Sequence, residues 1–433
     1  MSVDNPLKSK RRIPTSGQQL NLYEHVINAY ANNPDGLENV DLYNQVQLSG
    51  QIEQNDRERK PVGKSKEKHD LFARKVRWYQ QTMKHLELLQ KLDGTRGVWR
   101  LTGKGKKRLC KISSEYAVIG YSTKLGIAIW GDSIAMLRML DEPIHLAISS
   151  PPYMLSKQRS YGNPQGEHEY IDFICSTVEP IVKNLVPGGS IVLNIGQDVF
   201  ERGLPSRSII NERLTIAFCD RLGLHKMDQM VWHNKSKPPG PMPWASGTRQ
   251  QLNVAWEPVL WFCNDPLKCR SDNRRVLEPH TATHMKLMAA GGESRQISNS
   301  DGAYVIRKGK SYSNVTPGRI PRNVLAYGHA CGDQRAYKSK SKAYGLPAHG
   351  APFPVKLIEF LVKFLSEEGD VVLDWFSGSF TVGRACENTK RRWIGIECML
   401  EYVMGSSVRF EGCNGFWRND GLSRLVTTIS KQG

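Results

Sequence analysis

The stretch of the chain best suited to chemistry is a serine, two prolines and a tyrosine that end an apolar run. The run Ile144–Ser149 predicts a buried strand. The residues that follow it are Ser150, Pro151, Pro152 and Tyr153. Prolines end a strand, and open α/β folds bind their ligands beyond the carboxyl ends of strands. A hydroxyl, a backbone carbonyl and an aromatic ring so close together can hold a planar base by its amino group, although the same residues also fit an ordinary strand-ending turn.

A second group of polar residues lies in the last third of the chain. Apolar residues 371–373 predict a strand that ends at Asp374, followed by a loop of small residues, a helix and a strand that ends at Glu397. The interval between the two acids is close to the roughly 20 residues expected when the second acid binds ribose hydroxyls. The pattern therefore predicts half of a nucleoside-binding fold.

Further strands and helices complete an α/β pattern around these two groups. Apolar runs predict strands at 125–130, 190–195, 226–232 and 257–262, and short connections rich in Gly and Pro separate them from helices at 170–185 and 353–365. Alternation of strand, helix and strand predicts a parallel, doubly wound sheet. We assign residues 119–263 to a catalytic half of this domain and residues 347–433 to a cofactor-binding half.

The overall charge points to a polyanionic partner. The chain has 433 residues, a net charge of +18 and a pI near 9.5. Clustered Lys and Arg bind phosphates by releasing counterions, so we expect a nucleic acid, although charge alone also fits an acidic membrane surface. No apolar segment approaches the roughly 18 residues of a membrane span, and the first residues are polar and basic, so we expect a cytoplasmic protein with no membrane partner.

Cysteine and histidine spacing argues against a metal site. The nine cysteines include no C-x-x-C pair, and no pair of His or Cys has a spacing suited to zinc. We predict reduced thiols and no bound metal.

The first 112 residues predict a separate module. Residues 1–18 fit a flexible basic arm. Apolar positions from Phe72 to Leu86 recur at helical spacing and predict a helix that ends near Asp93 and Gly94, and residues 97–102 predict a strand. Helices closed by a basic hairpin describe a winged helix over 19–112, and RGVWRLTGKGK resembles the wing of N-terminal domains on some restriction-associated proteins. A role in core support or dimerisation stays open. The residues expected to contact DNA phosphates are Lys104, Lys106, Lys107 and Arg108.

Residues 264–346 lack clear periodicity. They combine scattered arginines with interleaved aromatic and aliphatic residues, which favours an irregular target-recognition insert over a disordered linker. Within it, Arg274 and Arg275 are candidate DNA contacts.

The order of these motifs resembles the S-adenosylmethionine-dependent amino-methyltransferases of DNA in which the catalytic tetrapeptide precedes the cofactor loop. The resemblance covers roughly residues 119–405. The matching pieces are Gly131–Ser133, Ser150–Tyr153, Pro187–Gly189, Val231–Asn234, His349 with Phe353 and Pro354, Asp374–Ser379, and Glu397. The implied fold is a Rossmann-like methyltransferase sheet.

The resemblance also implies a role for each motif. It places the loop after the first acid at the methionine part of S-adenosylmethionine, Glu397 at the ribose, and Trp232 as a second wall of a base pocket beside Tyr153. The implied cofactor-binding residues are Asp374, Phe376, Ser377, Gly378, Glu397, Phe353, Pro354 and Asp132, the last of which also fits a helix N-cap.

Chemistry explains why such an enzyme needs the tetrapeptide. The exocyclic amine of a base is a poor nucleophile and is buried in the duplex until the base is flipped out. Ser150 Oγ and the Pro151 carbonyl can each accept a hydrogen bond from one of the two N–H groups of the amine. Pro152 has no N–H that would tie up that carbonyl, and Tyr153 offers a stacking face worth about 1–3 kcal/mol.

Two departures from the family pattern stand in the cofactor loop. The family's loop usually reads Asp-Pro-Phe followed by Gly-Ser-Gly. Here Trp375 stands at the proline position and Phe380 at the second glycine position, and a bulky Phe380 is expected to crowd the cofactor. A decayed core on a non-catalytic winged-helix DNA-binding protein is therefore an alternative.

Serine at the first position of the tetrapeptide is typical of relatives that methylate N4 of cytosine. We therefore expect N4-cytosine modification of double-stranded DNA, with N6-adenine as the runner-up. The enzyme would pair with a restriction endonuclease of the same specificity and act as a monomer or weak dimer.

Overall fold

The computed structural model describes residues 25–26, 29–49, 59–61, 68–85, 89–92, 97–102, 117–153, 166–419 and 422, except 198, 202, 235, 299–301, 303, 330 and 351. The chain forms two compact units, Met1–Lys111 with Arg424–Gly433, and Ile112–Ser423. The basic arm 1–18 and the predicted wing residues Lys104, Lys106, Lys107 and Arg108 lie outside the described residues.

The described part of the first unit packs helices against a small sheet. The helix predicted from Phe72 is α3 (Leu71–His85), and the Asp70 carboxylate accepts from the Ala73 amide at its start. Its apolar positions, including Val76 and Met83, are buried in one core with α2 (Asn39–Ser49). The strands are β1 (Leu37–Glu38), β5 (Val98–Leu101) and β4 (Leu89–Lys91) in one antiparallel sheet, and β2 (Arg59–Pro61) with β3 (Lys68–Asp70) in another.

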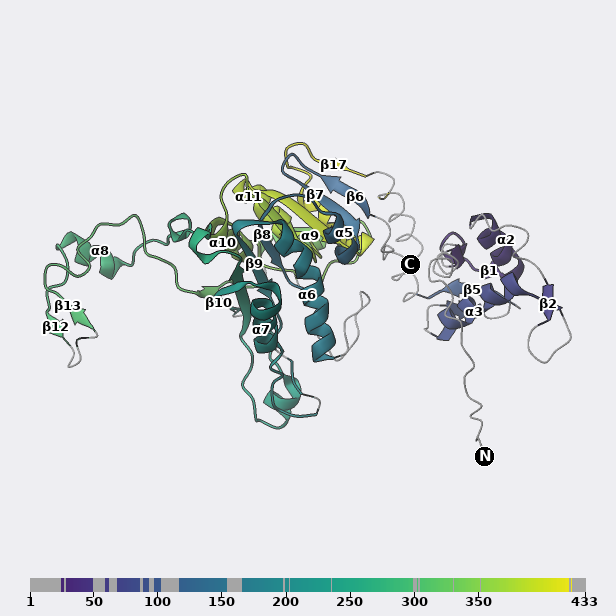
Figure 1. Cartoon of the computed structure of the whole chain (residues 1–433), viewed down its shortest axis with the longest axis horizontal. Coiled ribbons are helices and arrows are strands. Elements are labelled where there is room, and N and C mark those ends of the chain that lie inside the picture. Colours follow the sequence, from purple (N-terminus) through teal and green to yellow (C-terminus); the bar gives the residue numbers. More distant parts are fainter. Residues whose placement is uncertain are drawn as a thin grey trace, which may run out of the picture. The chain divides into compact units, whose positions relative to one another are not determined.

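The second unit (Figure 1) is built on a large sheet. Its ten strands have the order β14-β10-β11-β9-β8-β15-β16-β7-β6-β17. The five strands from β9 to β7 are parallel, as the sequence predicts, and antiparallel strands flank them. The bounds are β6 (Ala117–Ser122), β7 (Gly126–Gly131), β8 (Ile144–Ser149), β9 (Leu185–Asn194), β10 (His225–His233), β11 (Trp256–Cys263), β14 (Val324–Ala326), β15 (Val371–Asp374), β16 (Arg392–Glu397) and β17 (Trp417–Arg418).

Helices cover both faces of this sheet because its strands are apolar on both sides. Ile191, Leu193 and Leu373 share a core with α6 and α7, which lie side by side in Figure 1. The residues between them along the strands point to the opposite face of the sheet. On that face, Trp261 of β11 contacts Phe364 of α10. The helices are α5 (Ser133–Met139), α6 (Glu167–Asn184), α7 (Ile210–Leu222), α10 (Val355–Leu365), α11 (Thr381–Thr389) and α12 (Leu400–Ser406). The predicted doubly wound α/β fold is confirmed.

In its described part, the stretch 264–346, which the sequence predicts to be irregular, contains mostly short elements separated by loops. They are η3 (Pro266–Lys268), η4 (Asn273–Val276), α8 (Ala282–Ala289), β12 (Ile297–Ser298), β13 (Val305–Ile306) and α9 (Gly332–Ala343). β14 also belongs to this stretch, yet it pairs in parallel with β10 and so forms an edge of the main sheet. The remaining short helices are η2 (Met242–Gly247) and η5 (Ser407–Arg409). Among the described residues, no helix is long and apolar enough to cross a membrane.

Candidate active site

The predicted motifs meet at the carboxyl ends of the parallel strands. The stretch Ser150–Tyr153 follows β8, the loop 375–380 follows β15, and Glu397 ends β16. Since β8, β15 and β16 are neighbours in the sheet, two parts of the chain far apart in sequence form one site.

Ser149, the last residue of β8, joins the tetrapeptide to the cofactor loop. Its hydroxyl donates to Asp374 Oδ1 at 2.7 Å and accepts from the Phe376 amide at 3.2 Å. Both Ser149 and Asp374 are buried. Burial raises the pKa of Asp374 to about 7, with a smaller contribution from Glu397 in the same direction, while the bonds to Ser149 and Phe376 act against it.

Glu397 organises the loop from the next strand. Its carboxylate accepts from the Gly378 amide and from the Met399 amide, both at 2.8 Å. Burial raises the pKa of this carboxyl as well. Gly378 has a φ of +50°, and a Cβ there would lie 3.0 Å from the His349 ring, so glycine suits this position for conformation and for space.

These groups fit the cofactor that the resemblance implies. Two buried carboxylates with raised pKa values lie on adjacent strands, and the groups that shift the pKa of Asp374 are a hydroxyl, a backbone amide and a second acid. A ligand that brings a positive charge would therefore relieve the cost of their burial. A carboxylate also has lone pairs for the hydroxyls of a ribose, and S-adenosylmethionine supplies both the charge and the ribose.

The other predicted cofactor residues lie around this loop in different roles. Asp132 is the N-cap of α5 and accepts from the Ala135 amide at 3.1 Å, while the next residue, Ser133, donates to the Trp375 carbonyl. Ser377 Oγ donates to the Asp374 carbonyl at 2.8 Å. Pro354 is the N-cap of α10. For Asp132, the sequence allows either a cofactor contact or a helix N-cap, and in the structure it caps α5.

Both departures from the family pattern serve the core. Trp375 is fully buried and its indole N–H donates to Thr177 Oγ1 of α6 at 3.2 Å. Phe380 is buried with a φ of +55°, and its ring lies 5.5 Å from that of Tyr121. A Cβ at Gly395 would lie 2.6 Å from the Phe380 ring. The ring of Phe380 is thus packed among the strands of the sheet.

The tetrapeptide's tyrosine is held by its hydroxyl. Tyr153 OH accepts from Ser150 Oγ at 3.3 Å, and it donates to Asn194 Oδ1 at 3.0 Å and to Glu257 Oε2 at 3.1 Å. Its ring lies against Gly196, where a Cβ would be 2.8 Å from the ring. Burial raises the pKa of Tyr153 well above its usual value.

Trp232 lies in an aromatic cluster beside this network. It is buried, its ring stacks on His329 at 6.3 Å, and the ring of Phe353 lies 6.4 Å away. Its indole N–H donates to the Tyr327 carbonyl at 2.9 Å. Trp232 pairs with Glu257 across β10 and β11, so the two side chains share a face of the sheet. The predicted base-pocket wall and the predicted cofactor residue Phe353 therefore contact each other.

The two arginines predicted to contact DNA differ in their surroundings. Arg275 donates to the carbonyls of Lys363 and Ser366 at the end of α10, which gives it a structural role. Arg274 is exposed and forms an ion pair with Asp272 at 2.7 Å. Of the two, Arg274 is the better placed to meet an external phosphate.

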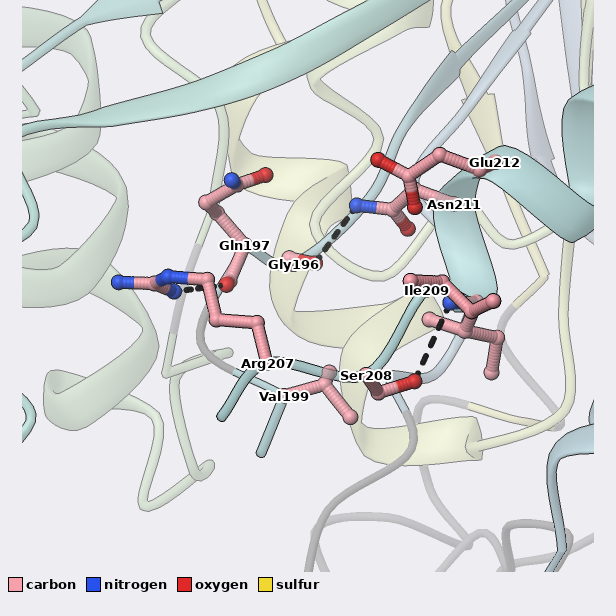
Figure 2. A pocket seen from close by; sticks show the side chains of 9 residues that line it. Gly196, Gln197, Val199, Arg207, Ser208, Ile209, Asn211 and Glu212 are labelled. Atoms are coloured by element: carbon pink, nitrogen blue, oxygen red, sulfur yellow. Dashed lines mark hydrogen bonds between the residues drawn. The ribbon is translucent and has the colours of Figure 1, made fainter. Parts of the chain in front are cut away.

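A small pocket of about 110 Å³ lies where β9 leads toward α7 (Figure 2). Gly196, which contacts Tyr153 on one side, lines this pocket. Asn211 and Arg207 donate to the carbonyls of Gly196 and Gln197, as Figure 2 shows. The pocket therefore adjoins the tyrosine of the tetrapeptide.

Sequence reasoning missed several polar residues of the site. They are Ser149, Asn194, Lys237, Glu257 and His329. The available signal was a polar side chain within an apolar strand, since Glu257 opens the run Pro258–Cys263 and Asn194 ends the run Ile191–Leu193. In the described part of the chain, no group of three or more His, Cys, Asp or Glu is arranged to hold a metal ion.

Comparison with known proteins matches both units. The family described as DNA methylase matches residues 144–407, and the Mrr N-terminal domain matches residues 21–111. The type II methyltransferase M.PvuII of Proteus hauseri is 35% identical over 67% of this chain and 85% of that protein. M.ScaI of Streptomyces caespitosus is 23% identical over 68% of this chain and 84% of that protein. The solved PvuII DNA methyltransferase (cytosine-N4-specific) has a TM-score of 0.54 and 29% identity, covering 73% of this chain and 96% of that one.

Proposed function

The chain belongs to the N6/N4 DNA methylase family, and we propose that it transfers a methyl group from S-adenosylmethionine to N4 of a flipped-out cytosine in double-stranded DNA. The observation that carries this proposal is the hydrogen bond from Ser149 to Asp374. This bond joins the tetrapeptide to the loop whose buried acids fit the cofactor. The groups that accept from the amine and the groups that would bind the methyl donor therefore form one site.

Each part of the site has a role in the reaction. The bound cofactor supplies an electrophilic methyl group. Asp374 and Glu397 are the groups that would hold it, while Ser150 Oγ and the Pro151 carbonyl orient the amine of the base. Two acceptors directed at the two N–H bonds favour a nitrogen whose lone pair is free to attack. No acidic residue is needed at the first position for this orientation.

Two observations favour cytosine over adenine. The tetrapeptide begins with serine, and the relative with 35% identity has a solved counterpart described as cytosine-N4-specific. We further propose that the protein is the modification enzyme of a restriction system, acts as a monomer or weak dimer in the cytoplasm, and has an endonuclease partner of the same specificity.

The test is to incubate the protein with labelled S-adenosylmethionine and mixed-sequence DNA, digest the DNA and identify the labelled nucleoside. We expect N4-methylcytosine. Label in N6-methyladenine would show that the target base is adenine and not cytosine. An absence of label in DNA would reject the proposed methyltransferase activity.

The matched variant Ser150→Ala tests the assigned acceptor. Binding of S-adenosylmethionine should stay within about twofold of wild type, while the methylation rate should fall about 100-fold, the size typical of a lost positioning or proton-transfer group. A rate near that of wild type would show that Ser150 does not orient the amine.

A further inference from the structure

A continuous line of hydrogen bonds leads from the tetrapeptide to a carboxylate on β11. It begins at Ser150 Oγ, passes through Tyr153 OH at 3.3 Å, and ends at Glu257 Oε2, 3.1 Å further on. The Tyr153 hydroxyl is also 3.0 Å from Asn194 Oδ1. Three strands, β8, β9 and β11, therefore contribute to one polar network inside the site.

The direction of the donors is consistent along this line. Ser150 donates to the Tyr153 oxygen, and Tyr153 donates toward Glu257 and Asn194. The Asn194 amide nitrogen donates to the Pro258 carbonyl at 3.1 Å, which fixes its oxygen toward Tyr153. Because Ser150 uses its proton for Tyr153, its lone pairs remain available to accept from an amine.

The carboxylate at the end of the line is paired with a lysine. Lys237 Nζ lies 2.8 Å from Glu257 Oε1, and the side chains of this pair are only 17% and 16% exposed. The lysine pairs with one oxygen while the other faces Tyr153. A hydrogen bond to a charged acceptor is stronger than one to a neutral amide, so Glu257 is the preferred acceptor over Asn194.

We propose that the proton released by the target amine passes through Ser150 and Tyr153 to Glu257. This rests on the proposed methyl transfer. As the amine nitrogen forms its bond to the methyl carbon, the carbon–sulfur bond breaks and its electron pair stays on sulfur. The nitrogen then gives one proton to Ser150 Oγ, Ser150 gives its own to Tyr153, and Tyr153 gives its own to Glu257 Oε2. The positive charge brought by the sulfonium is cancelled by neutralisation of the carboxylate.

The environment of Tyr153 requires these protons to move together. Burial raises the pKa of its hydroxyl well above the usual value, and the neighbouring Glu257 raises it further. A free tyrosinate therefore does not accumulate, and Tyr153 receives a proton as it releases one. The ring keeps its stacking face throughout, so a single residue serves both the base and the proton.

The experiment compares Tyr153→Phe, which keeps the ring and removes the relay hydroxyl, with Glu257→Gln and with the double variant. Single-turnover methylation should fall about 100-fold in each single variant, as for other lost proton-transfer groups. The double variant should be no slower than the single ones, because either change breaks the same line. Affinities for S-adenosylmethionine and for DNA should stay within about twofold.

The matched control is Tyr170→Phe. Tyr170 is a buried tyrosine of α6 whose hydroxyl makes no hydrogen bond among the described residues. The same chemical change there should leave the methylation rate unaltered. If Glu257→Gln fails to fold because its ion pair with Lys237 is lost, Tyr153→Phe still tests the relay.

Two further readouts separate a relay from mere support of the fold. Single-turnover rates should also be measured in mixtures of light and heavy water. A plot of rate against deuterium fraction should be curved for the wild type and linear for Tyr153→Phe. In the free protein, the NMR signal of the Tyr153 ring carbon that bears the hydroxyl should shift in Glu257→Gln, since its hydrogen-bond acceptor has lost its charge.

The outcomes distinguish the relay from the proposed function. An active wild type with a Tyr153→Phe rate within about twofold of it would overturn the relay alone, because a lost general acid or base costs far more. An unshifted Tyr153 signal in Glu257→Gln would do the same. A wild type that labels no DNA would instead reject the methyl transfer on which the relay rests.

Discussion

At the scale of single residues, Asp374 is a buried carboxyl whose ionised form is costly. Its pKa of about 7 is raised mainly by burial, and Ser149 holds one of its oxygens. In the protein without ligand, the ionised form is therefore disfavoured relative to the unfolded chain, where an aspartate has a pKa near 3.9. The folded protein without ligand is therefore less stable at neutral pH than it would be with a neutral side chain at position 374.

The change Asp374→Asn should thus stabilise the ligand-free protein in a pH-dependent way. Below about pH 4 the wild-type side chain is protonated in both states. As the pH rises from about 4 to about 7, the wild type loses up to about 4 kcal/mol relative to the variant, the equivalent of the difference between the two pKa values. Urea unfolding of both proteins at pH 4 and pH 8 measures this.

The gain in stability should come with a loss of binding. Asp374→Asn should bind S-adenosylmethionine more weakly, because the buried charge that favours a cationic ligand is gone. A stability difference between the two proteins that is the same at pH 4 and pH 8 would contradict the assigned cause of the raised pKa.

At the scale of elements, the loop between β15 and α11 is fixed to the core by contacts with two helices. Trp375 stands where the family usually has proline, and its indole donates to Thr177 of α6 from a fully buried position. The loop is anchored to a helix by this side chain, and on the other side by Ser133 of α5.

Restoring the family residue should therefore be harmful. Trp375→Pro should lower the free energy of unfolding by about 3–5 kcal/mol, the usual cost of removing a large buried aromatic side chain. Thr177→Val keeps the packing and removes only the acceptor, and it should cost about 1–3 kcal/mol because the indole N–H is left buried without a partner. Urea unfolding of the two variants gives both values. A Trp375→Pro protein as stable as wild type would show that the indole is not part of the anchor.

The elements that the sequence predicts well are those with a strong apolar pattern. The strand at 144–149 agrees with β8 at both ends, and the helix predicted from Phe72 begins within a residue of α3. Its predicted end near Asp93 is wrong, because α3 ends at His85 and residues 89–91 form β4. The turn expected at Pro187–Gly189 instead lies inside β9, because the strand begins at Leu185. Local pattern finds the elements, but pairing in the sheet decides where they begin.

The contacts of the site are harder to predict because they join distant segments. Ser149 and Asp374 are 225 residues apart, and Tyr153 and Glu257 are 104 apart. Motif order places Asp374 and Glu397 correctly in one loop region. The neighbours of Tyr153 depend on which strand lies beside β9, and this follows from sheet order and register, which no local spacing encodes.

At the scale of the whole molecule, two units and a net charge of +18 suggest that DNA is bound over more than the catalytic site. The unit that matches the Mrr N-terminal domain contains the predicted wing. Its basic residues remain a prediction, since they lie outside the described residues. If they bind phosphates, they should contribute counterion release that the methylase unit cannot supply alone.

A fourfold variant tests this contribution: Lys104→Gln, Lys106→Gln, Lys107→Gln and Arg108→Gln. Each lost phosphate contact should reduce the slope of log affinity against log salt by about 0.9, so the slope should decrease by up to about 3.6. The methylated nucleoside should be unchanged, because the base pocket is untouched. Binding measured over a salt series provides the slope, and an unchanged slope would remove the wing from the DNA interface.

The strand order of the main sheet also governs how the chain can fold as it is made. β7 and β8 follow each other closely in sequence, yet β15 and β16 separate them in the sheet. On the ribosome, both early strands therefore keep an unpaired edge until residue 397 has emerged. The centre of the sheet is completed last. Synthesis thus leaves a long interval in which apolar strands are exposed, and a chaperone that covers such edges would raise the yield of active protein more than it would for a sheet assembled in chain order.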